Sequence, residues 1–197
     1  MRSIKTKTSW GYINRKNKPT LNVQATCDSK EMFTSVDVSW PGSVHDARIW
    51  KNSPVREVMR TTRNTVLIGD DGYGLEPWLM TPFSVLDNES ESKFNKLLKK
   101  ERVVIERCFG QLKRRFPILQ YVCRVKLEKV PKIIVACVVL HNIAKSLGDP
   151  DFEHDEDILE EDEDLGDIAA DAEIRGNLRH EGQAVRRNLA EIISQLI

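Results

Sequence analysis

The chain has 197 residues, 40% of them hydrophobic, which is enough for one globular core and at most one short appendage. Its formal net charge of zero hides a division, because residues 1 to 148 carry 26 Lys and Arg against 14 Asp and Glu, whereas residues 149 to 197 carry 4 against 16. The first 16 residues contain no apolar core that could serve as a signal peptide, which favours an intracellular protein. The longest apolar run, Ile133 to Leu140, is far too short to cross a bilayer.

The basic body, residues 1 to 148, favours polyanionic partners. Lys and Arg supply the sequence-independent part of nucleic-acid binding, because they displace counterions from phosphates. A basic surface that serves only solubility is the alternative. The charge division therefore points to nucleic acid without establishing it.

The first predicted elements are a β-hairpin and a helix. Residues 20 to 38 read as two short strands with alternating apolar positions, separated by a polar turn. Ser43, followed three residues later by Asp46, resembles a capping box. It predicts one helix over residues 46 to 59.

A short strand and two helices are predicted next. Val66 to Ile68 is fully apolar and is followed by Gly69 and two aspartates, the pattern of a buried strand whose end carries polar side chains. Residues 92 to 116 repeat apolar side chains at helical spacing and predict one long helix. Residues 131 to 147 are apolar almost all round, which predicts the most buried helix. This order of elements predicts an α/β domain with a mixed sheet.

The composition changes abruptly at residues 148 to 150. We place a domain boundary there, so that residues 1 to 148 form the domain and residues 149 to 197 an acidic tail. Residues 151 to 167 are a block of like charges, which repels itself and predicts disorder. Residues 183 to 196 space their apolar side chains as an amphipathic helix, which requires a partner surface to be stable.

Three acidic residues are candidates for a metal site. Asp46, Asp70 and Glu106 lie at the ends of elements, or on a helix, that an α/β core could bring to one side of a sheet. Carboxylate oxygens are the ligands that Mg²⁺ and Mn²⁺ prefer, and two such ions stabilise the attacking and leaving oxygens of a phosphodiester. Asp70 is the strongest of the three, because it follows an apolar strand at the edge where open α/β sheets bind ligands. Asp71 is its rival.

Each acid also has a structural explanation that the sequence leaves open. Asp70 can form a turn with Gly72. Glu106 can be an ordinary surface residue that supports a charge pattern with Lys113. Asp46 can simply satisfy free amides at a helix start.

Basic residues cluster on the long predicted helix and form a candidate phosphate-binding surface. Such contacts would position DNA without reading its sequence. An ordinary solvated helical face is an equally good explanation. The residues are Lys99, Lys100, Arg102, Arg107, Lys113, Arg114 and Arg115.

Five segments, taken in order, resemble one known family. They are YINRKNKPTLNVQATCD, SWPGSVHDARIWKNSPV, LIGDDGYGLEPWLMTPF, VVIERCFGQLKRRFPIL and IIVACVVLHNIA. Together they resemble the catalytic domain of the PIF/Harbinger transposases and of the Harbinger transposase-derived nucleases. The resemblance covers roughly residues 12 to 147.

The resemblance implies an RNase H-like fold, with a mixed sheet flanked by helices, in which a DDE set of carboxylates binds two divalent ions, Mg²⁺ or Mn²⁺. That set drives hydrolysis and strand transfer of DNA in the family. By motif, Asp70 matches the family's second Asp and Glu106 its Glu, and Asp46 enters as a weaker metal ligand. The resemblance also implies a protein of the nucleus, with the cytoplasm as a second location, and a Myb/SANT-like partner that supplies sequence-specific DNA binding.

The chain departs from the family's pattern at its start. The family's first catalytic Asp belongs to a strand upstream of the YINRK segment, and residues 1 to 11 contain no Asp. We therefore expect a sheet without its first strand, an exposed edge and some instability. Either the chain is a metal-dependent DNA nuclease weakened or inactivated by that loss, or it is a non-catalytic module that binds DNA or protein.

Overall fold

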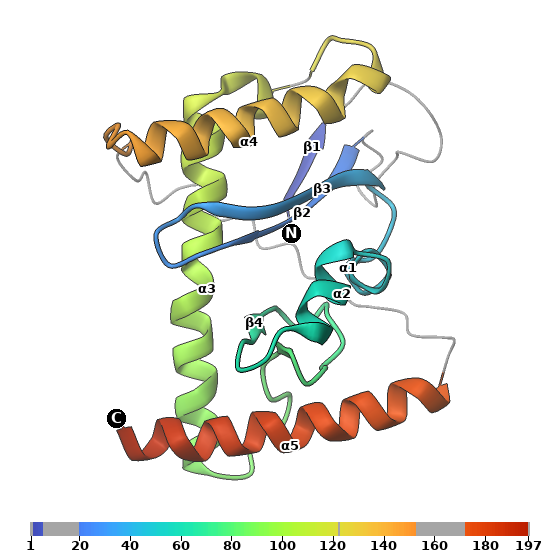
Figure 1. The fold of residues 1–197 in the computed structure, drawn as a ribbon, viewed down its shortest axis with the longest axis vertical. Helices are drawn as coiled ribbons and strands as arrows, with labels where there is room; N and C mark the ends of the chain where they lie inside the picture. Colours follow the sequence, from blue (N-terminus) through green and yellow to red (C-terminus); the bar gives the residue numbers. More distant parts are fainter. Residues whose placement is uncertain (1, 6–19, 122, 153–171, 197) are drawn as a thin grey trace. The chain divides into compact units, whose positions relative to one another are not determined.

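The computed structural model describes residues 2–5, 20–121, 123–152 and 172–196 (Figure 1). The chain divides into two compact units. The first unit comprises Met1–Ile49 and Val104–Asp162, and the second comprises Trp50–Val103 and Glu163–Ile197. Each unit contains a small sheet with helices, so the predicted α/β class is confirmed. In place of the predicted mixed sheet, the described strands form one antiparallel sheet and one separate parallel pair.

The first unit is built on a three-stranded antiparallel sheet in the order β1-β2-β3. β2 (Thr20–Cys27) and β3 (Phe33–Pro41) form the predicted hairpin. The Asp28 carboxylate shapes its turn by accepting hydrogen bonds from two backbone amides of the turn. β1 (Arg2–Lys5), which the sequence did not predict, pairs with the other edge of β2, so β2 is a central strand.

The core of the first unit lies where β2 and β3 meet two helices, α3 (Glu89–Arg115) and α4 (Val130–Ser146). α4 packs along β3 (Figure 1). Alternation along β2 sends Leu21 and Val23 into this apolar core, so the residues between them face the other way. There the buried Asn22 side chain donates a hydrogen bond to the Val44 carbonyl at 2.6 Å. Short 3₁₀ turns at Pro117–Leu119 and Leu127–Lys129 connect α3 to α4.

The helix predicted over residues 46 to 59 is in fact two helices. α1 (Asp46–Lys51) ends before Ser53, whose hydroxyl accepts a hydrogen bond from the Val55 amide and caps α2 (Pro54–Thr61). Proline lacks an N–H and is favoured in the first turn of a helix. The Ser-Pro pair therefore ends one helix and begins the next.

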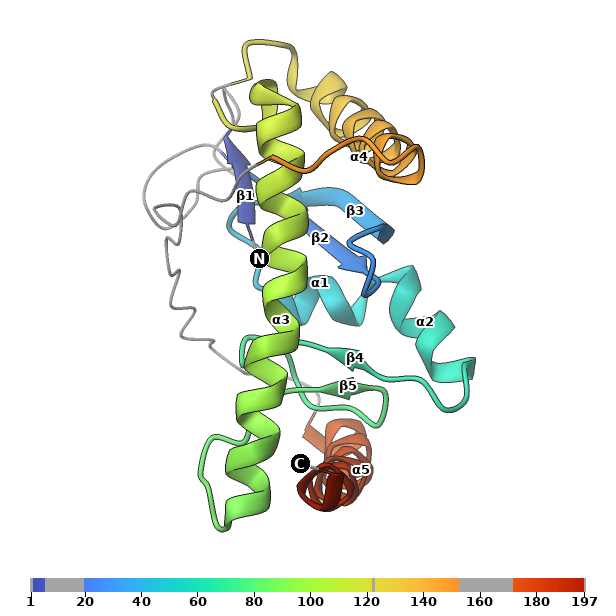
Figure 2. The ribbon, with the colours of Figure 1, turned by 90° about the vertical axis from the view of Figure 1, so that its left-hand side faces the viewer.

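The second unit contains a two-stranded parallel sheet, β4 (Leu67–Ile68) and β5 (Leu79–Met80) (Figure 2). β4 confirms the strand predicted at residues 66 to 68, but the expectation that it is buried is wrong, because Val66 is 38% exposed and Ile68 is 44% exposed. The buried strand is β5, which is too short to show a pattern in the sequence.

The two long predicted helices are confirmed with small shifts in their ends. α3 begins three residues earlier than predicted, because the Asn88 side chain accepts a hydrogen bond from the Glu91 amide at 2.9 Å. α4 begins at Val130 and buries one side only. Although α4 is apolar almost all round, its other side carries exposed apolar residues, since Val139 is 51% exposed and Leu140 is 52% exposed.

α5 (Ala172–Leu196) is the predicted amphipathic helix of the tail, extended toward its start. Its partner surface lies in the second unit, on β5, on the loop that follows and on the first part of α3. The buried residues of this contact are Met80, Phe83, Phe94, Leu98 and Ala190. The disorder predicted for residues 151 to 167 falls largely outside the described residues, and the domain boundary at residue 148 stays a prediction.

Among the described residues, no helix combines the length and apolarity that a membrane span requires.

Candidate acidic site and nucleic-acid-binding residues

Asp70 follows β4, and its carboxylate makes both a hydrogen bond within a tight turn and an ion pair. Its Oδ1 accepts a hydrogen bond from the Gly72 amide at 3.1 Å, which is the turn that the sequence left open as an alternative. Its Oδ2 lies 3.6 Å from Nη2 of Arg102 on α3. The Asp70 side chain is 21% exposed, so its carboxylate remains accessible to a small ion. Asp71, the rival candidate, is exposed.

The loop after Asp70 is held in place by Glu76. The Glu76 carboxylate accepts hydrogen bonds from Trp50 Nε1 at 3.1 Å and from Arg56 Nε at 2.9 Å. Tyr73 meets the Trp50 ring edge to face at a centroid distance of 6.3 Å. Sequence reasoning missed Glu76, because its partners lie 20 and 26 residues away and no local pattern marks such pairs.

Glu106 and Asp46 belong to the first unit and differ in their surroundings. Glu106 lies on α3, half-buried, and no residue in the described part of the chain pairs with its carboxylate. Asp46 is 8% exposed in the first turn of α1, where the helix dipole favours a negative charge. Glu106 is therefore a carboxylate available to a ligand, whereas the position of Asp46 also fits a helix-capping role.

The chemistry of these acids fits a hard divalent cation, because all three would offer carboxylate oxygens. Asp46 and Glu106 lie in the first unit and Asp70 in the second. Within the described ranges, no three His, Cys, Asp or Glu side chains gather closely enough to hold a metal ion. The roles predicted for the three acids stay predictions.

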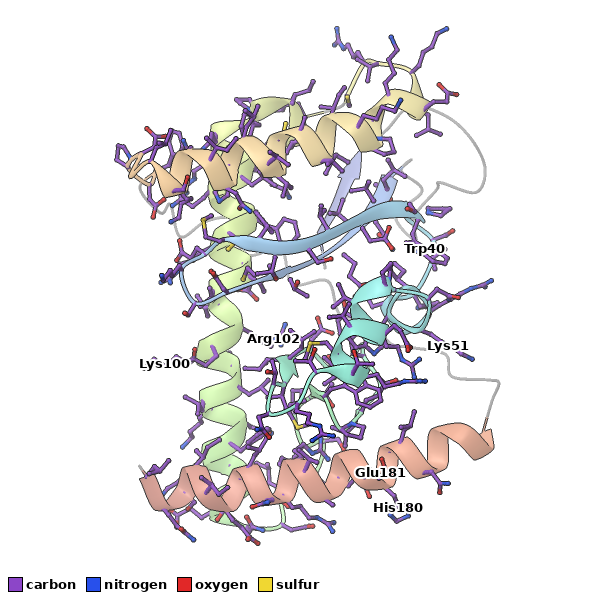
Figure 3. The ribbon with its side chains drawn as sticks, in the orientation of Figure 1. Trp40, Lys51, Lys100, Arg102, His180 and Glu181 are labelled. Atoms are coloured by element: carbon purple, nitrogen blue, oxygen red, sulfur yellow. The ribbon has the colours of Figure 1, made fainter. Side chains whose placement is uncertain are left out.

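The seven candidate DNA-contacting residues on α3 are not equivalent. Lys99 and Lys100 are exposed, and Lys100 and Arg102 leave the helix on opposite sides (Figure 3). Arg102 pairs with Asp70 as described. Two further cations are engaged in ion pairs of the first unit, Arg107 at 2.6 Å from Glu31 and Arg115 with an acidic partner considered below. Lys113 and Arg114 are half-buried and also make interactions.

These differences separate the cations into two groups. Lys99 and Lys100 are free to meet a phosphate backbone. Arg102, Arg107 and Arg115 first have to give up a carboxylate of the chain itself. The sequence showed where positive charge gathers but could not show which cations are already neutralised.

Comparisons with known proteins bear on the whole region that carries these residues. The family of the DDE superfamily endonuclease matches residues 3–142, a range that contains all three candidate acids. The protein named "Putative nuclease HARBI1" of Mus musculus is 33% identical over 142 residues, which cover 70% of this chain and 41% of that protein. The protein of the same name from Homo sapiens is 32% identical over the same length and with the same coverage.

A plant protein, "Protein ALP1-like" of Arabidopsis thaliana, is 27% identical over 155 residues, which cover 70% of this chain and 38% of that protein. The chain thus spans about two fifths of the length of the curated relatives it matches. No solved structure matches the chain. On the family match and these relatives, the chain belongs to the DDE superfamily endonucleases, among the Harbinger-derived nucleases.

Proposed function

We propose that the chain carries part of the active site of a divalent-metal-dependent DNA nuclease, in which Asp70 and Glu106 are the catalytic acids and Asp46 is a further metal ligand. The observation that carries this proposal is the half-buried Glu106 carboxylate, which has no ion-pair partner in the described part of the chain and lies inside the family match. The proposal includes an RNase H-like arrangement of the complete domain and a location in the nucleus.

DDE superfamily endonucleases generally use divalent metals. Mg²⁺ or Mn²⁺, when bound, would supply a Lewis acid for phosphodiester hydrolysis. Asp70 and Glu106 would hold the cation through their oxygens, and Asp46 would complete the set. Arg102 sits beside Asp70 and would neutralise part of the charge of an incoming phosphate. Lys99 and Lys100 would bind the DNA backbone on either side.

The second candidate is a non-catalytic module that binds DNA or a protein such as a Myb/SANT-like factor. The ion pair between Asp70 and Arg102 favours this alternative, because a carboxylate already held by a guanidinium and by the Gly72 amide binds a cation less readily. Such a module would bind DNA in a salt-sensitive manner even when both acids are neutralised.

Nicking of supercoiled DNA by the purified protein distinguishes the two. We expect nicking that requires Mg²⁺ or Mn²⁺ and that falls about a thousandfold in Asp70→Asn and in Glu106→Gln, because each change removes several kcal/mol of charge stabilisation. Asp71→Asn is the matched control, since it makes the same change at the exposed neighbour. Full activity in Asp70→Asn, or loss of activity in Asp71→Asn alone, would refute the assignment of Asp70.

A further inference from the structure

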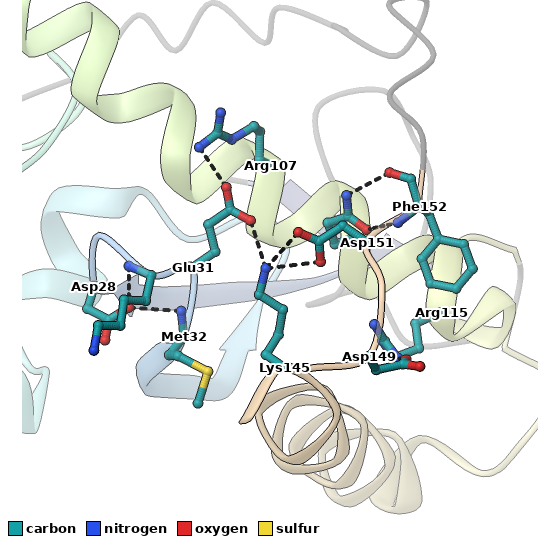
Figure 4. A network of polar contacts seen from close by, with 11 residues as sticks. Asp28, Glu31, Met32, Arg107, Arg115, Lys145, Asp149, Asp151 and Phe152 are labelled. Carbon is teal, nitrogen blue, oxygen red and sulfur yellow. Dashed lines mark hydrogen bonds and ion pairs between the residues drawn. The ribbon is translucent and has the colours of Figure 1, made fainter. Parts of the chain in front are cut away.

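Residues 149 to 152 are bound by side chains of α3 and α4 in the first unit (Figure 4). Asp149 pairs with Nη1 of Arg115, and Asp151 lies 2.8 Å from Nζ of Lys145. The ring of Phe152 stacks under the Arg115 guanidinium, whose Cζ atom lies 5.3 Å from the ring centroid. Three residues of this four-residue segment thus contact the cations Arg115 and Lys145.

Gln111 completes this site by making two hydrogen bonds with the backbone of Phe152. Its Nε2 donates to the Phe152 carbonyl, and its Oε1 accepts from the Phe152 amide, both at 2.8 Å. Gln111 is only 7% exposed, so the site forms part of the packed surface and is no loose contact of surface groups.

The bound segment presents a characteristic set of groups to the protein. Asp149 and Asp151 present two negative charges with one residue between them, and Phe152 presents a flat ring together with a donor beside an acceptor. A single-stranded nucleic acid presents the same set. Its phosphates carry the charge, and its bases offer a flat face and a donor-acceptor edge. Glutamine reads the adenine edge through one donor and one acceptor, and arginine stacks on bases.

The segment satisfies the site only in part. Arg115 is 11% exposed on its side chain, and its Nε and Nη2 are buried without a hydrogen-bond partner in the described part of the chain. A carboxylate that meets one guanidinium nitrogen leaves these donors unused. A phosphate offers more acceptor oxygens and can take two parallel hydrogen bonds from one arginine.

We propose that Gln111, Arg115 and Lys145 form a binding site for single-stranded DNA, and that residues 149 to 152 occupy this site as an intramolecular mimic of a nucleotide. The inference rests on the proposed function for its choice of DNA as the partner. It adds that the bound DNA is single-stranded, and it names residues 149 to 152 as the segment that limits access of DNA to the site.

A mimic attached to the site lowers the apparent affinity for DNA. When a site is free only one tenth of the time, releasing it raises the apparent affinity about tenfold. The change that releases the site is Asp149→Asn with Asp151→Asn, because it removes both charges of the mimic and keeps the shapes of its side chains.

The experiment measures binding of a labelled single-stranded oligodeoxyadenylate by fluorescence anisotropy at about 50 mM salt, where phosphate contacts are strong. We expect about tenfold tighter binding by the double variant. Asp155→Asn with Asp157→Asn is the matched control, because it makes the same change of net charge in the neighbouring acidic run. We expect this control to bind within about twofold of the unaltered protein. Adding Arg115→Gln to the Asp149/Asp151 variant should abolish the gain.

Equal gains in both double variants would overturn the proposal, because they would show an effect of net charge alone. A second measurement uses the unaltered protein and so does not depend on how the variants fold. Binding of the oligonucleotide should speed up hydrogen exchange at the Phe152 amide, which loses its bond to Gln111. Unchanged or slower exchange at this amide would contradict displacement of the mimic.

The same proteins separate this inference from the proposed function. Tighter binding by the Asp149/Asp151 variant without any metal-dependent nicking would support the site and refute the nuclease. Nicking that depends on Asp70, with no gain in single-strand binding, would support the nuclease and refute the site.

Discussion

His141 is a fully buried titratable side chain of the first unit, with 0% of its surface exposed. Its ring meets Phe33 edge to face at a centroid distance of 5.5 Å, and neither ring nitrogen makes a hydrogen bond of good geometry among the described residues. Burial lowers the pKa of His141, and the nearby charges of Arg115 and Lys145 lower it further, while the Glu31 backbone and the charge of Asp151 act in the opposite sense. The folded protein therefore holds this histidine neutral.

The neutral His141 makes the stability of the first unit depend on pH. Because the pKa is lower in the folded than in the unfolded chain, the stabilisation is complete above the ordinary value of 6.5 and is lost as the pH falls through the folded value. We expect the free energy of unfolding, measured with urea, to decrease as the pH falls from about 7.5 to about 5.5, a window of about one unit on each side of that value. His141→Phe should flatten this dependence.

His180→Gln is the control for this measurement, because His180 is exposed on α5. An equal pH dependence in His141→Phe and in the unaltered protein would show that other groups set it.

The candidate acids could be named from the sequence, whereas their contacts could not. Asp70 and Glu106 stand in segments that resemble a family, and that resemblance identified them when spacing alone left their roles open. The ion pair between Asp70 and Arg102 joins residues 32 positions apart, because folding brings α3 back to the loop after β4. Periodicity along the chain carries no information on such a pair.

At the scale of elements, α5 shows how a helix that is weak alone becomes part of a core. Ala190 is 1% exposed at the centre of its buried face. Arg186 adds a polar anchor, since its Nη1 donates hydrogen bonds to the carbonyls of Thr81 and Pro82, and its guanidinium lies 3.9 Å from the centroid of the Phe83 ring. Apolar packing and this anchor together fix α5 on the second unit.

Arg186→Ala should destabilise the second unit by about 2 to 3 kcal/mol, because it leaves two carbonyls without their charged donor and removes a cation–π contact. Arg187→Ala is the matched control on the same helix, where the exposed side chain makes none of these contacts and the expected cost is within about 0.5 kcal/mol. Thermal and urea unfolding measure both. Equal losses in the two variants would show that Arg186 acts through helix propensity alone.

Helices were easier to predict than strands for a physical reason. α3 repeats apolar side chains over several turns and α4 is a long, almost wholly apolar segment, so both remain visible in the sequence even where the capping residues were missed. β4 and β5 each contain two residues, which show no period, and their burial is decided by neighbours that the local sequence does not reveal. The break between α1 and α2 was readable in principle from Ser53 and Pro54, because serine caps helices and proline begins them.

For the whole molecule, the division of charge matters more than its sum. The basic body carries 26 Lys and Arg, but several of them already pair with carboxylates in the fold. The positive charge that can reach DNA is therefore smaller than the composition suggests. Lys99 and Lys100 belong to this available part.

Lys99→Gln with Lys100→Gln should weaken binding to duplex DNA of any sequence and reduce the slope of log affinity against log salt by about two. The reason is that each lysine neutralises one phosphate and releases its counterion. Lys30→Gln with Lys132→Gln is the control, since it removes two exposed lysines elsewhere. Fluorescence anisotropy across a salt series measures the slopes, and identical slopes in the two double variants would exclude a specific role for Lys99 and Lys100.

Glu31 lies at the tip of the β2–β3 hairpin with a φ of 61°, and its carboxylate pairs with both Arg107 of α3 and Lys145 of α4. Two helices therefore share one anion. Removing either cation changes the strength with which the carboxylate holds the other, so the energetic effects of the two are not independent. Glu31, Arg107 and Lys145 therefore contribute jointly to the free energy of unfolding of the first unit, and only a double-mutant cycle can separate their contributions.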